Sequence, residues 1–288
     1  MGDVDERRVL AVYGHPDDEG QATGTLAGAL AAGVRVTLLC ATRGEVGEIS
    51  DPALATPETL AYVRELELRA AMAQIGLTDV RFLPFRDSGM EGTPPNEDPR
   101  CLHRQPADAV VSELVGLMRE LRPHVVLTWD PEGGYGHPDH IAVHRHVVAA
   151  FDAAGDPSQH ADRGAAWAPE RLYWGARPMK RWAGVFAEME RRGLVAADEI
   201  NPAFRERAEA ALRAPDPVVS LQVDVRAHVA AKRRAARMHR TQFGENSMFA
   251  RIPPELEAEF FGDELFYRAR PAWPDGAEPE RGLWATEA

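Results

Sequence analysis

Residues 9–20 read VLAVYGHPDDEG, an apolar run that ends abruptly in a cluster of His, Pro, Asp and Glu. The run, which starts at Arg8 and ends at Tyr13, is short and continuous, as in a β-strand that is buried on both faces. Such strands belong to parallel sheets that have helices on both sides. This stretch therefore predicts the first strand of an α/β fold, with HPDDE in the loop that follows it.

The rest of the first half repeats the order of strand, polar loop and helix. We expect further strands at Val34–Ala41, Val80–Leu83 and His124–Trp129, and helices at Glu19–Ala32, Thr56–Ile75, Ala107–Leu121 and His140–Ala153. Thr56 is a suitable cap for its helix, and Gly33 follows the end of an earlier one. Strands that alternate with helices imply right-handed crossovers, so we predict a mostly parallel sheet with helices on both faces.

The pattern is weaker after Gly155. Strand patterns occur at Arg171–Trp174 and Val218–Val225, helix patterns at Met179–Arg192 and Val225–His239, and a Pro-, Gly- and Glu-rich tail, expected at the surface, from Pro271 onward. A chain of 288 residues suits one large domain or one domain with an added lobe. We expect residues 1–155 to form the core that carries the site. Residues 156–288 should continue the sheet and add a smaller C-terminal lobe, within one compact domain.

Composition and charge narrow the class of protein. The fractions of hydrophobic residues, 44%, and charged residues, 27%, are ordinary for a globular protein. The formal net charge of −12 argues against a general binder of nucleic acid or membrane surfaces, because both are polyanionic. Cys40 and Cys101 give no disulfide framework, and Met1–Arg8 lacks the apolar segment of a signal peptide. We expect a cytoplasmic protein with a small-molecule partner, either monomeric or a homo-oligomer.

Polar clusters follow each of the four strands in the first half. They are His15–Glu19, Thr42–Glu48, Arg86–Gly89 and Asp130–His140. In an open parallel sheet, ligands bind beyond the carboxyl ends of the strands, which lie along one edge. We therefore expect the four clusters to share one rim, although they are distant in sequence.

The first and last clusters each join His to Asp through proline, as HPDD and HPDH. A catalytic zinc ion takes about three protein ligands from His, Asp and Glu and leaves a position for water. His15, Asp18 and His140 could supply those ligands. Asp17 would then remain free to accept a proton from the water, which gives a nucleophile near neutral pH.

Each motif also has a simpler interpretation. HPDD could be a turn that ends a strand, and HPDH could be a helix start, with Asp139 as the N-cap and His140 in the first turn. A different zinc hydrolase could use His140 and His144, but Ile141 stands where HExxH metalloproteases carry their glutamate. We expect His144 and His146 on a helix surface. Two His–Pro–Asp clusters at one edge of a sheet favour the metal site.

The helix predicted from Thr56 carries a charged residue within an apolar stripe. The stripe consists of Leu60, Arg64, Leu68, Ala71 and Ile75. Glu67 flanks Arg64, so a simple salt bridge at the edge of the core is one interpretation. The other is that these charges line the pocket and bind substrate hydroxyls, with Asp87 nearby.

Five segments resemble the LmbE-like family, also called the N-acetylglucosaminyl-phosphatidylinositol (GlcNAc-PI) de-N-acetylase or PIG-L family. They are GHPDDE (14–19), TRGEVGEI (42–49), RDSGM (86–90), RPHVVLTWDPEGGYGHPDH (122–140) and, more weakly, RTQF (240–243). Within the family the chain resembles mycothiol deacetylases and mycothiol S-conjugate amidases. The resemblance implies a Rossmann-like fold and one zinc ion per chain, although iron(II) accepts similar ligands. Residues 155–224 match no single subfamily, so the aglycone of the substrate stays open.

Position in these motifs implies roles for the metal site and the base. His15, Asp18 and His140 would be the metal ligands. Asp17 would be the general base and would later donate a proton to the departing amine.

The same resemblance implies roles around the acyl group and the sugar. His137 would polarise the acyl carbonyl and stabilise the oxyanion, Asp139 would orient His137 or tune its basicity, and Tyr135 would add a second donor. The residues implied for the sugar are Arg64, Asp87 and, at the rim, Glu48.

The implied activity is removal of the acetyl group from an N-acetylglucosaminyl substrate of low-molecular-weight thiol biosynthesis, joined to inositol or malate. One alternative is a thiol S-conjugate amidase of detoxification. Another is a non-catalytic metal- or sugar-binding protein, which the presence of both Asp17 and His137 disfavours. A nucleotide-binding protein is excluded, because GHPDDEG lacks the glycine-rich pattern and its acidic residues would repel a pyrophosphate.

Overall fold

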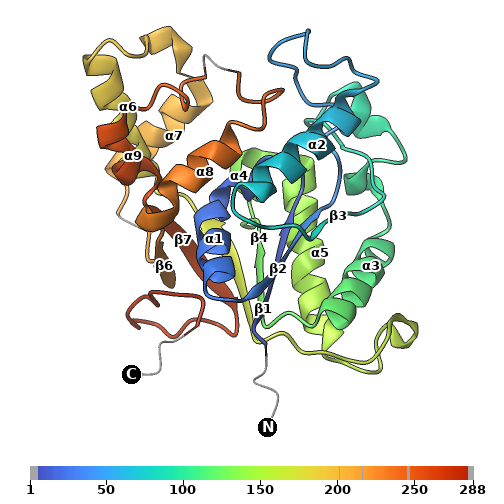
Figure 1. Cartoon of the computed structure of the whole chain (residues 1–288). Helices are drawn as coiled ribbons and strands as arrows, with labels where there is room; N and C mark the ends of the chain where they lie inside the picture. The colour runs from blue at the N-terminus through green and yellow to red at the C-terminus, as the bar shows by residue number, and fades with distance from the viewer. Residues whose placement is uncertain (1–5, 201, 216, 245–246, 285–288) are drawn as a thin grey trace.

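A single sheet runs through the centre of the computed structural model, which describes residues 6–200, 202–215, 217–244 and 247–284 (Figure 1). Its strand order is β3-β2-β1-β4-β5-β7-β6. The strands are β1 Arg8–Tyr13, β2 Arg35–Cys40, β3 Val80–Phe82, β4 Val125–Thr128, β5 Arg171–Ala176, β6 Leu221–Asp224 and β7 Asp263–Arg270. β3, β2, β1, β4 and β5 are parallel, and β7 is antiparallel to both of its neighbours. The prediction of a mostly parallel α/β sheet is confirmed.

The strand order reverses at β1. β2 pairs with one side of β1 and β4 pairs with the other. Open α/β sheets bind their ligands at such a switch point, in the crevice beyond the carboxyl ends of the strands. The loops after β1 and β4, which carry HPDD and HPDH, therefore meet at this crevice.

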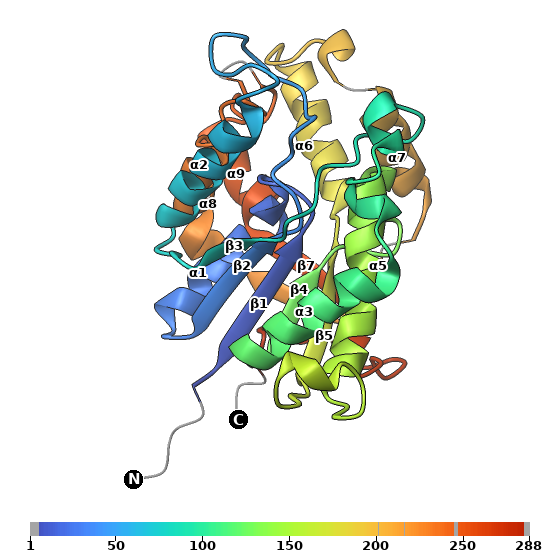
Figure 2. The same ribbon diagram turned by 90° about the vertical axis from the view of Figure 1, so that its right-hand side faces the viewer.

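Helices cover both faces of the sheet, as Figure 2 shows. One face carries α1 Thr23–Ala31, α2 Leu60–Ala73 and α8 Val229–Ala236, and the other carries α3 Ala107–Leu121 and α5 Pro138–Ala154. A short turn, α4 Gly133–Gly136, precedes α5. Three further helices gather at one side of the sheet in Figure 1: α6 Met179–Arg191, α7 Pro202–Arg213 and α9 Pro254–Phe261. None of the helices in the described part of the chain is long and apolar enough to cross a membrane.

Two helices begin later than the sequence pattern indicates. Asp18–Gln21 forms a separate 3₁₀ turn before α1, and α2 begins at Leu60 instead of Thr56. The Thr56 hydroxyl donates to the carboxylate of Glu58, 2.7 Å away, and does not cap the helix. The prediction that Thr56 caps this helix is therefore wrong, because its hydroxyl is hydrogen-bonded to a nearby carboxylate instead.

The second half contains more regular structure than we expect from its sequence. α7, α9 and β7 lie outside the expected elements, although β7 is the strand that joins β5 to β6. The tail is also ordered up to residue 284. Glu280 forms a bridge with Leu221 and accepts a 2.6 Å hydrogen bond from the Tyr173 hydroxyl, and Leu283 is buried. The tail thus lies largely at the surface, as expected, but these contacts hold it against the sheet; residues 1–5 and 285–288 lie outside the described chain.

Glu264 on β7 links the two halves of the chain. Its buried carboxylate accepts the N–H groups of Gly24 and Thr25 at the start of α1, at 2.9 and 2.7 Å, and pairs with Lys232 on α8 at 2.5 Å. A carboxylate at a helix N-terminus satisfies N–H groups that have no partner within the helix. The second half therefore docks onto the first through a buried polar contact.

Candidate metal and catalytic site

Three ligand-type atoms converge at the switch point. Nδ1 of His15 lies 3.0 Å from Nε2 of His140, and Oδ2 of Asp18 lies 3.5 and 3.2 Å from these two nitrogens. Donors held at about 2.1 Å from zinc in a tetrahedral arrangement are about 3.3 Å apart. The spacing of the three atoms therefore fits a divalent metal ion.

Hydrogen bonds on the far side of each ring determine which nitrogen faces this point. Nε2 of His15 lies 3.0 Å from Oδ2 of Asp139, and Nδ1 of His140 lies 3.1 Å from the carbonyl oxygen of Gly133. Both partners are acceptors, so each of these nitrogens carries the proton. When both rings are neutral, Nδ1 of His15 and Nε2 of His140 direct two lone pairs at each other, an arrangement that a shared cation satisfies.

Two residues that sequence reasoning missed support these ligands. The Trp129 ring stacks on His140 at a centroid distance of 4.0 Å, and its Nε1–H donates to Oδ2 of Asp18 at 3.3 Å. Ser88 donates its backbone N–H, at 2.9 Å, and its hydroxyl to the fully buried carboxylate of Asp139. Both residues lie inside the motifs TWDP and RDSG, which is the signal that could have identified them.

The charges around the site favour a bound cation. Burial opposes a positive charge on His15, yet the charge of Asp87 and hydrogen bonds to Asp139 and Asp18 hold its pKa well above the ordinary value. Burial also opposes the charge on Asp18, yet His140 and His15 hold the pKa of that carboxyl well below its usual range. Two overlapping groups place their ligand atoms within 4.8 Å of one another: His15, His137 and His140, and His15, Asp87, His137 and Asp139. The described residues therefore include a buried His and Asp cluster that could hold a metal ion.

Asp17 lies beside these donors in an unusual backbone conformation. Its φ is 103°, a left-handed value that is strained for a residue with a Cβ atom. Its N–H donates to Oε2 of Glu19 at 2.8 Å, and its Oδ2 lies 3.3 Å from Nη2 of Arg64. Burial raises the pKa of Asp17 to about 6, against the opposing effect of the Arg64 charge. A carboxyl group with this pKa can accept a proton near neutral pH.

Arg64 is buried and binds oxygen atoms of the protein. Nη2 donates to the carbonyl oxygen of Pro16 at 2.6 Å, and Nη1 to that of Gly44 at 3.0 Å. A Cβ atom at Gly44 would lie 2.0 Å from Nη1, so glycine is needed for this approach. Glu67 accepts instead from the N–H and hydroxyl of Thr241, at 2.9 and 2.6 Å. The salt bridge between Arg64 and Glu67 is therefore the wrong interpretation, and contact of Arg64 with a sugar stays a prediction.

His137 is the N-cap of α5, so the expectation that Asp139 caps this helix is wrong. The backbone N–H of Asp139 donates to Nδ1 of His137 at 3.2 Å, while the Asp139 carboxylate binds His15. Burial and the charges of His15 and His140 lower the pKa of His137 to about 4. A neutral ring whose Nδ1 accepts a hydrogen bond carries its proton on Nε2. His137 therefore presents an N–H donor on the side where Oδ1 of Asp87 lies, 4.0 Å away.

The remaining predicted residues surround the cluster at different depths. Tyr135 is 45% exposed, and its ring lies 6.0 Å from that of His137. Partial loss of water around the hydroxyl, with the charge of Asp18, raises the pKa of Tyr135 to about 12, so the hydroxyl keeps its proton. Asp87 is buried, and its N–H donates to Oε2 of Glu45 at 3.0 Å. The side chain of Glu48 is exposed, and its carbonyl oxygen accepts from Nε2 of Gln242 at 2.9 Å. The structure thus brings Tyr135 and Asp87 near His137 and leaves Glu48 at the surface.

His144 differs from its predicted surface position. It is buried, and its Nδ1 lies 2.8 Å from the carbonyl oxygen of Trp129, to which it donates. His146 is partly buried, and burial lowers its pKa. His144 thus supports the backbone of the strand end that carries Trp129.

Comparison with known proteins identifies the family. The sequence profile of the PIG-L family, described as GlcNAc-PI de-N-acetylase, matches residues 10–151. A protein of Geodermatophilus obscurus, named 1D-myo-inositol 2-acetamido-2-deoxy-alpha-D-glucopyranoside deacetylase, is 39% identical in an alignment 278 residues long that covers 92% of this chain and 92% of that protein. The chain belongs to the PIG-L family of de-N-acetylases. The resemblance found in the motifs is confirmed.

Solved structures show how widely this fold is used. N,N'-diacetylchitobiose deacetylase from Pyrococcus horikoshii matches with a TM-score of 0.64 at 18% identity, covering 92% of this chain and 84% of its own. GalB, the 4-carboxy-2-hydroxymuconate hydratase from Pseudomonas putida KT2440, matches with a TM-score of 0.60 at 17% identity, covering 94% of this chain and 100% of its own. At these identities the likeness shows the fold alone. Because a hydratase shares it with a deacetylase, the reaction of a PIG-L family member has to be argued from its side chains.

Proposed function

We propose that the protein is a zinc-dependent deacetylase that hydrolyses the acetamide of 1D-myo-inositol 2-acetamido-2-deoxy-α-D-glucopyranoside (GlcNAc-inositol), releasing acetate and the free amine. The observation that carries this proposal is the convergence of His15, Asp18 and His140 beside Asp17. The name of the Geodermatophilus obscurus relative, whose similarity extends over most of both chains, supports inositol over malate as the aglycone.

The metal and the base act together in this proposal. His15, Asp18 and His140 would hold the ion, and bound zinc supplies Lewis acidity that lowers the pKa of a water molecule. Asp17 accepts a proton from the attacking water and returns it to the departing amine. Its 18% exposed side chain is accessible to water, and Arg64 stabilises its charged form.

The acyl oxygen needs donors when negative charge develops on it. Nε2–H of His137 fills this role, because the backbone of Asp139 fixes the ring and its low pKa keeps the ring neutral. The Tyr135 hydroxyl, from the exposed turn that precedes α5, supplies a second donor. Pre-oriented donors of this kind stabilise the tetrahedral transition state of amide hydrolysis.

The proposal also covers the residues that bind the sugar, the identity of the metal and the cellular location. Arg64, Asp87 and Glu48 bind sugar hydroxyls, with Glu48 outermost. Iron(II) fits the same donors as zinc, so both metals belong in the test. We place the reaction in the cytoplasm, in keeping with two cysteines, Cys40 and Cys101, that are both buried free thiols.

The test measures release of free amine by metal-stripped protein before and after one equivalent of zinc or iron(II) is restored. The substrates are GlcNAc-inositol, GlcNAc-malate and a thiol S-conjugate that contains the same amide. We expect zinc-restored protein to act fastest on GlcNAc-inositol. No amine from GlcNAc-inositol, with one metal ion bound per chain, would overturn the proposal.

A further inference from the structure

Glu19, the last residue of HPDDE, connects the backbone of Asp17 to a histidine from the other half of the chain. Oε2 of Glu19 accepts the Asp17 N–H at 2.8 Å, and Oε1 lies 2.7 Å from Nε2 of His239. Glu19 and His239 are 2% and 1% exposed, so water does not compete for this pair. The carboxylate thus binds the base on one side and the histidine on the other.

The hydrogen bond between His239 and Glu19 supports the one between Glu19 and the Asp17 backbone. A buried carboxylate is costly unless it is paired, and Nε2 of His239 is the side-chain partner of Glu19. Burial opposes a charge on His239, but the charge of Glu19 and the hydrogen bond to it raise the pKa of His239. The Asp17 backbone is strained at φ 103°, so it keeps that conformation only while its surroundings fix it. Without His239, the carboxylate that holds the Asp17 N–H would lose its own support.

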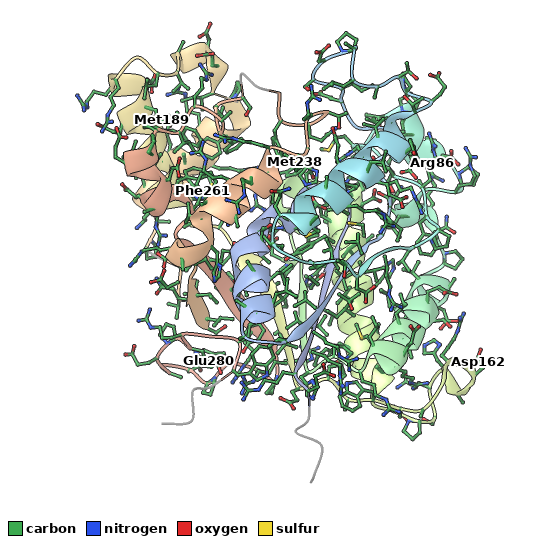
Figure 3. The ribbon with its side chains drawn as sticks, viewed as in Figure 1. Arg86, Asp162, Met189, Met238, Phe261 and Glu280 are labelled. Atoms are coloured by element: carbon green, nitrogen blue, oxygen red, sulfur yellow. The ribbon has the colours of Figure 1, made fainter. Side chains whose placement is uncertain are left out.

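His239 reaches the site because the chain after α8 is fixed at several points. α8 packs against α1 and α2, and Figure 3 marks Met238, the neighbour of His239, between α8 and α2. Thr241 binds Glu67 on α2, as described above. The hydroxyl of Ser50 donates to the carbonyl oxygen of Arg240 at 2.7 Å. These contacts fix the position of His239 against Glu19, which in turn binds the Asp17 N–H.

We propose that His239 is a positioning residue for the reaction: acting through Glu19, it holds the Asp17 backbone in the conformation that directs the carboxylate at the site. The inference rests on the proposed function for the role of Asp17 as the base. His239 directly precedes the RTQF segment, which is the weakest of the motifs that resemble the family. The inference therefore assigns a role to this region.

The experiment compares His239→Leu, which removes the donor, with His239→Gln, which keeps an N–H at similar reach. We expect His239→Leu to lower kcat by about 10-fold or more, the order of loss that misplacement of a reacting group causes, with unchanged KM and zinc content. His239→Gln should recover most of the loss. Glu19→Gln should also lower kcat, and adding His239→Leu to it should cause little further loss, because both act through the same bond.

The matched control is His124→Leu. His124 is also a buried histidine, whose Nδ1 accepts the Arg8 N–H at 3.2 Å, but it lies at the amino end of β4, away from the site. This variant should lose stability and keep its kcat per folded chain. A kcat for His239→Leu within twofold of wild type, about 0.4 kcal/mol, would overturn the proposal, as would zinc loss that accounts for the lost activity.

A second readout does not depend on the substrate. In ¹⁵N-labelled protein, the Asp17 amide resonance should move in His239→Leu and return towards its original position in His239→Gln. If the wild-type protein releases no amine from any substrate, the proposed function fails while this readout still tests the coupling. An Asp17 amide resonance that is the same in wild type and His239→Leu would overturn the inference.

Discussion

Nη2 of Arg64 lies 3.3 Å from Oδ2 of Asp17, so an arginine that sequence reasoning assigned to the sugar forms an ion pair with the proposed base. Both side chains are largely buried, at 5% and 18% exposure, so water screens their interaction only partly. The arginine also binds the carbonyl oxygen of Pro16, directly before Asp17. Arg64 therefore influences both the charge and the position of the base.

Replacing Arg64 should change the pH dependence of the reaction. The Arg64 charge lowers the pKa of Asp17, so Arg64→Met should raise that pKa. A base works only when unprotonated, so the acidic limb of kcat/KM should move to higher pH in Arg64→Met. Arg64→Lys, which keeps the charge, should leave the limb close to its wild-type position. A pH–rate profile of each variant checks this; identical limbs for Arg64→Met and wild type would contradict it.

Arg119 should be a major contributor to stability, because its buried guanidinium organises a whole loop. It donates to the carbonyl oxygens of Ala153, Ala154, Asp156, Gln159, His160 and Gly164. Arg119→Met removes all of these hydrogen bonds and leaves a buried space where the charged guanidinium joined the loop, so we expect the free energy of unfolding to fall by about 3 kcal/mol. Urea denaturation measures it, with the exposed Arg100→Met as a control that should change little. Equal stability of the Arg119 and Arg100 variants would contradict this account.

His239 should make stability depend on pH. Its pKa is raised in the folded protein, so its stabilising effect is fully present below the unfolded value of about 6.5 and is lost as pH rises through the folded value. The difference in unfolding free energy between wild type and His239→Gln should therefore shrink as pH rises above that point. Urea titrations of zinc-saturated protein at several pH values would show this. A difference that is constant or grows with pH would be inconsistent with the ion pair.

Glu264 tests our proposal that residues 1–155 and 156–288 fold as one domain. Glu264→Leu removes the cap of α1 and leaves Lys232 without its buried partner, which should cost about 3 kcal/mol. If the halves fold together, this variant should still unfold in one transition, at lower denaturant. Fluorescence and circular dichroism should report the same midpoint. Two separate transitions would show that the halves unfold independently.

Much of the core and of the metal site follows from the sequence, because both depend on local patterns. Continuous apolar runs identify β1, β2 and β4, whose residues are almost all buried. The rule that ligands lie beyond parallel strand ends then brings His15, Asp18 and His140 together. Boundaries were less accurate where a side chain binds nearby backbone, as Thr59 binds that of Thr56 and Glu19 that of Asp17, because those contacts compete with helix formation.

The missed features depend on contacts that are distant in sequence. β7 reads DELFYRAR, and its charged residues hide a strand that is fixed by pairing with β5 and β6. The contacts of Arg64 with Asp17 and of His239 with Glu19 span 47 and 220 residues, so no local pattern indicates them. Only the fold identifies the partner of a buried charge.

The central claim is that Asp17 is the base beside a metal that other residues hold. The most direct test measures zinc content and turnover of GlcNAc-inositol for Asp17→Asn, with His15→Ala and Asp18→Ala alongside. We expect Asp17→Asn to keep zinc and to lose turnover by about 100-fold or more, whereas the ligand variants should lose both. Near-normal turnover by Asp17→Asn across the pH range would contradict the account.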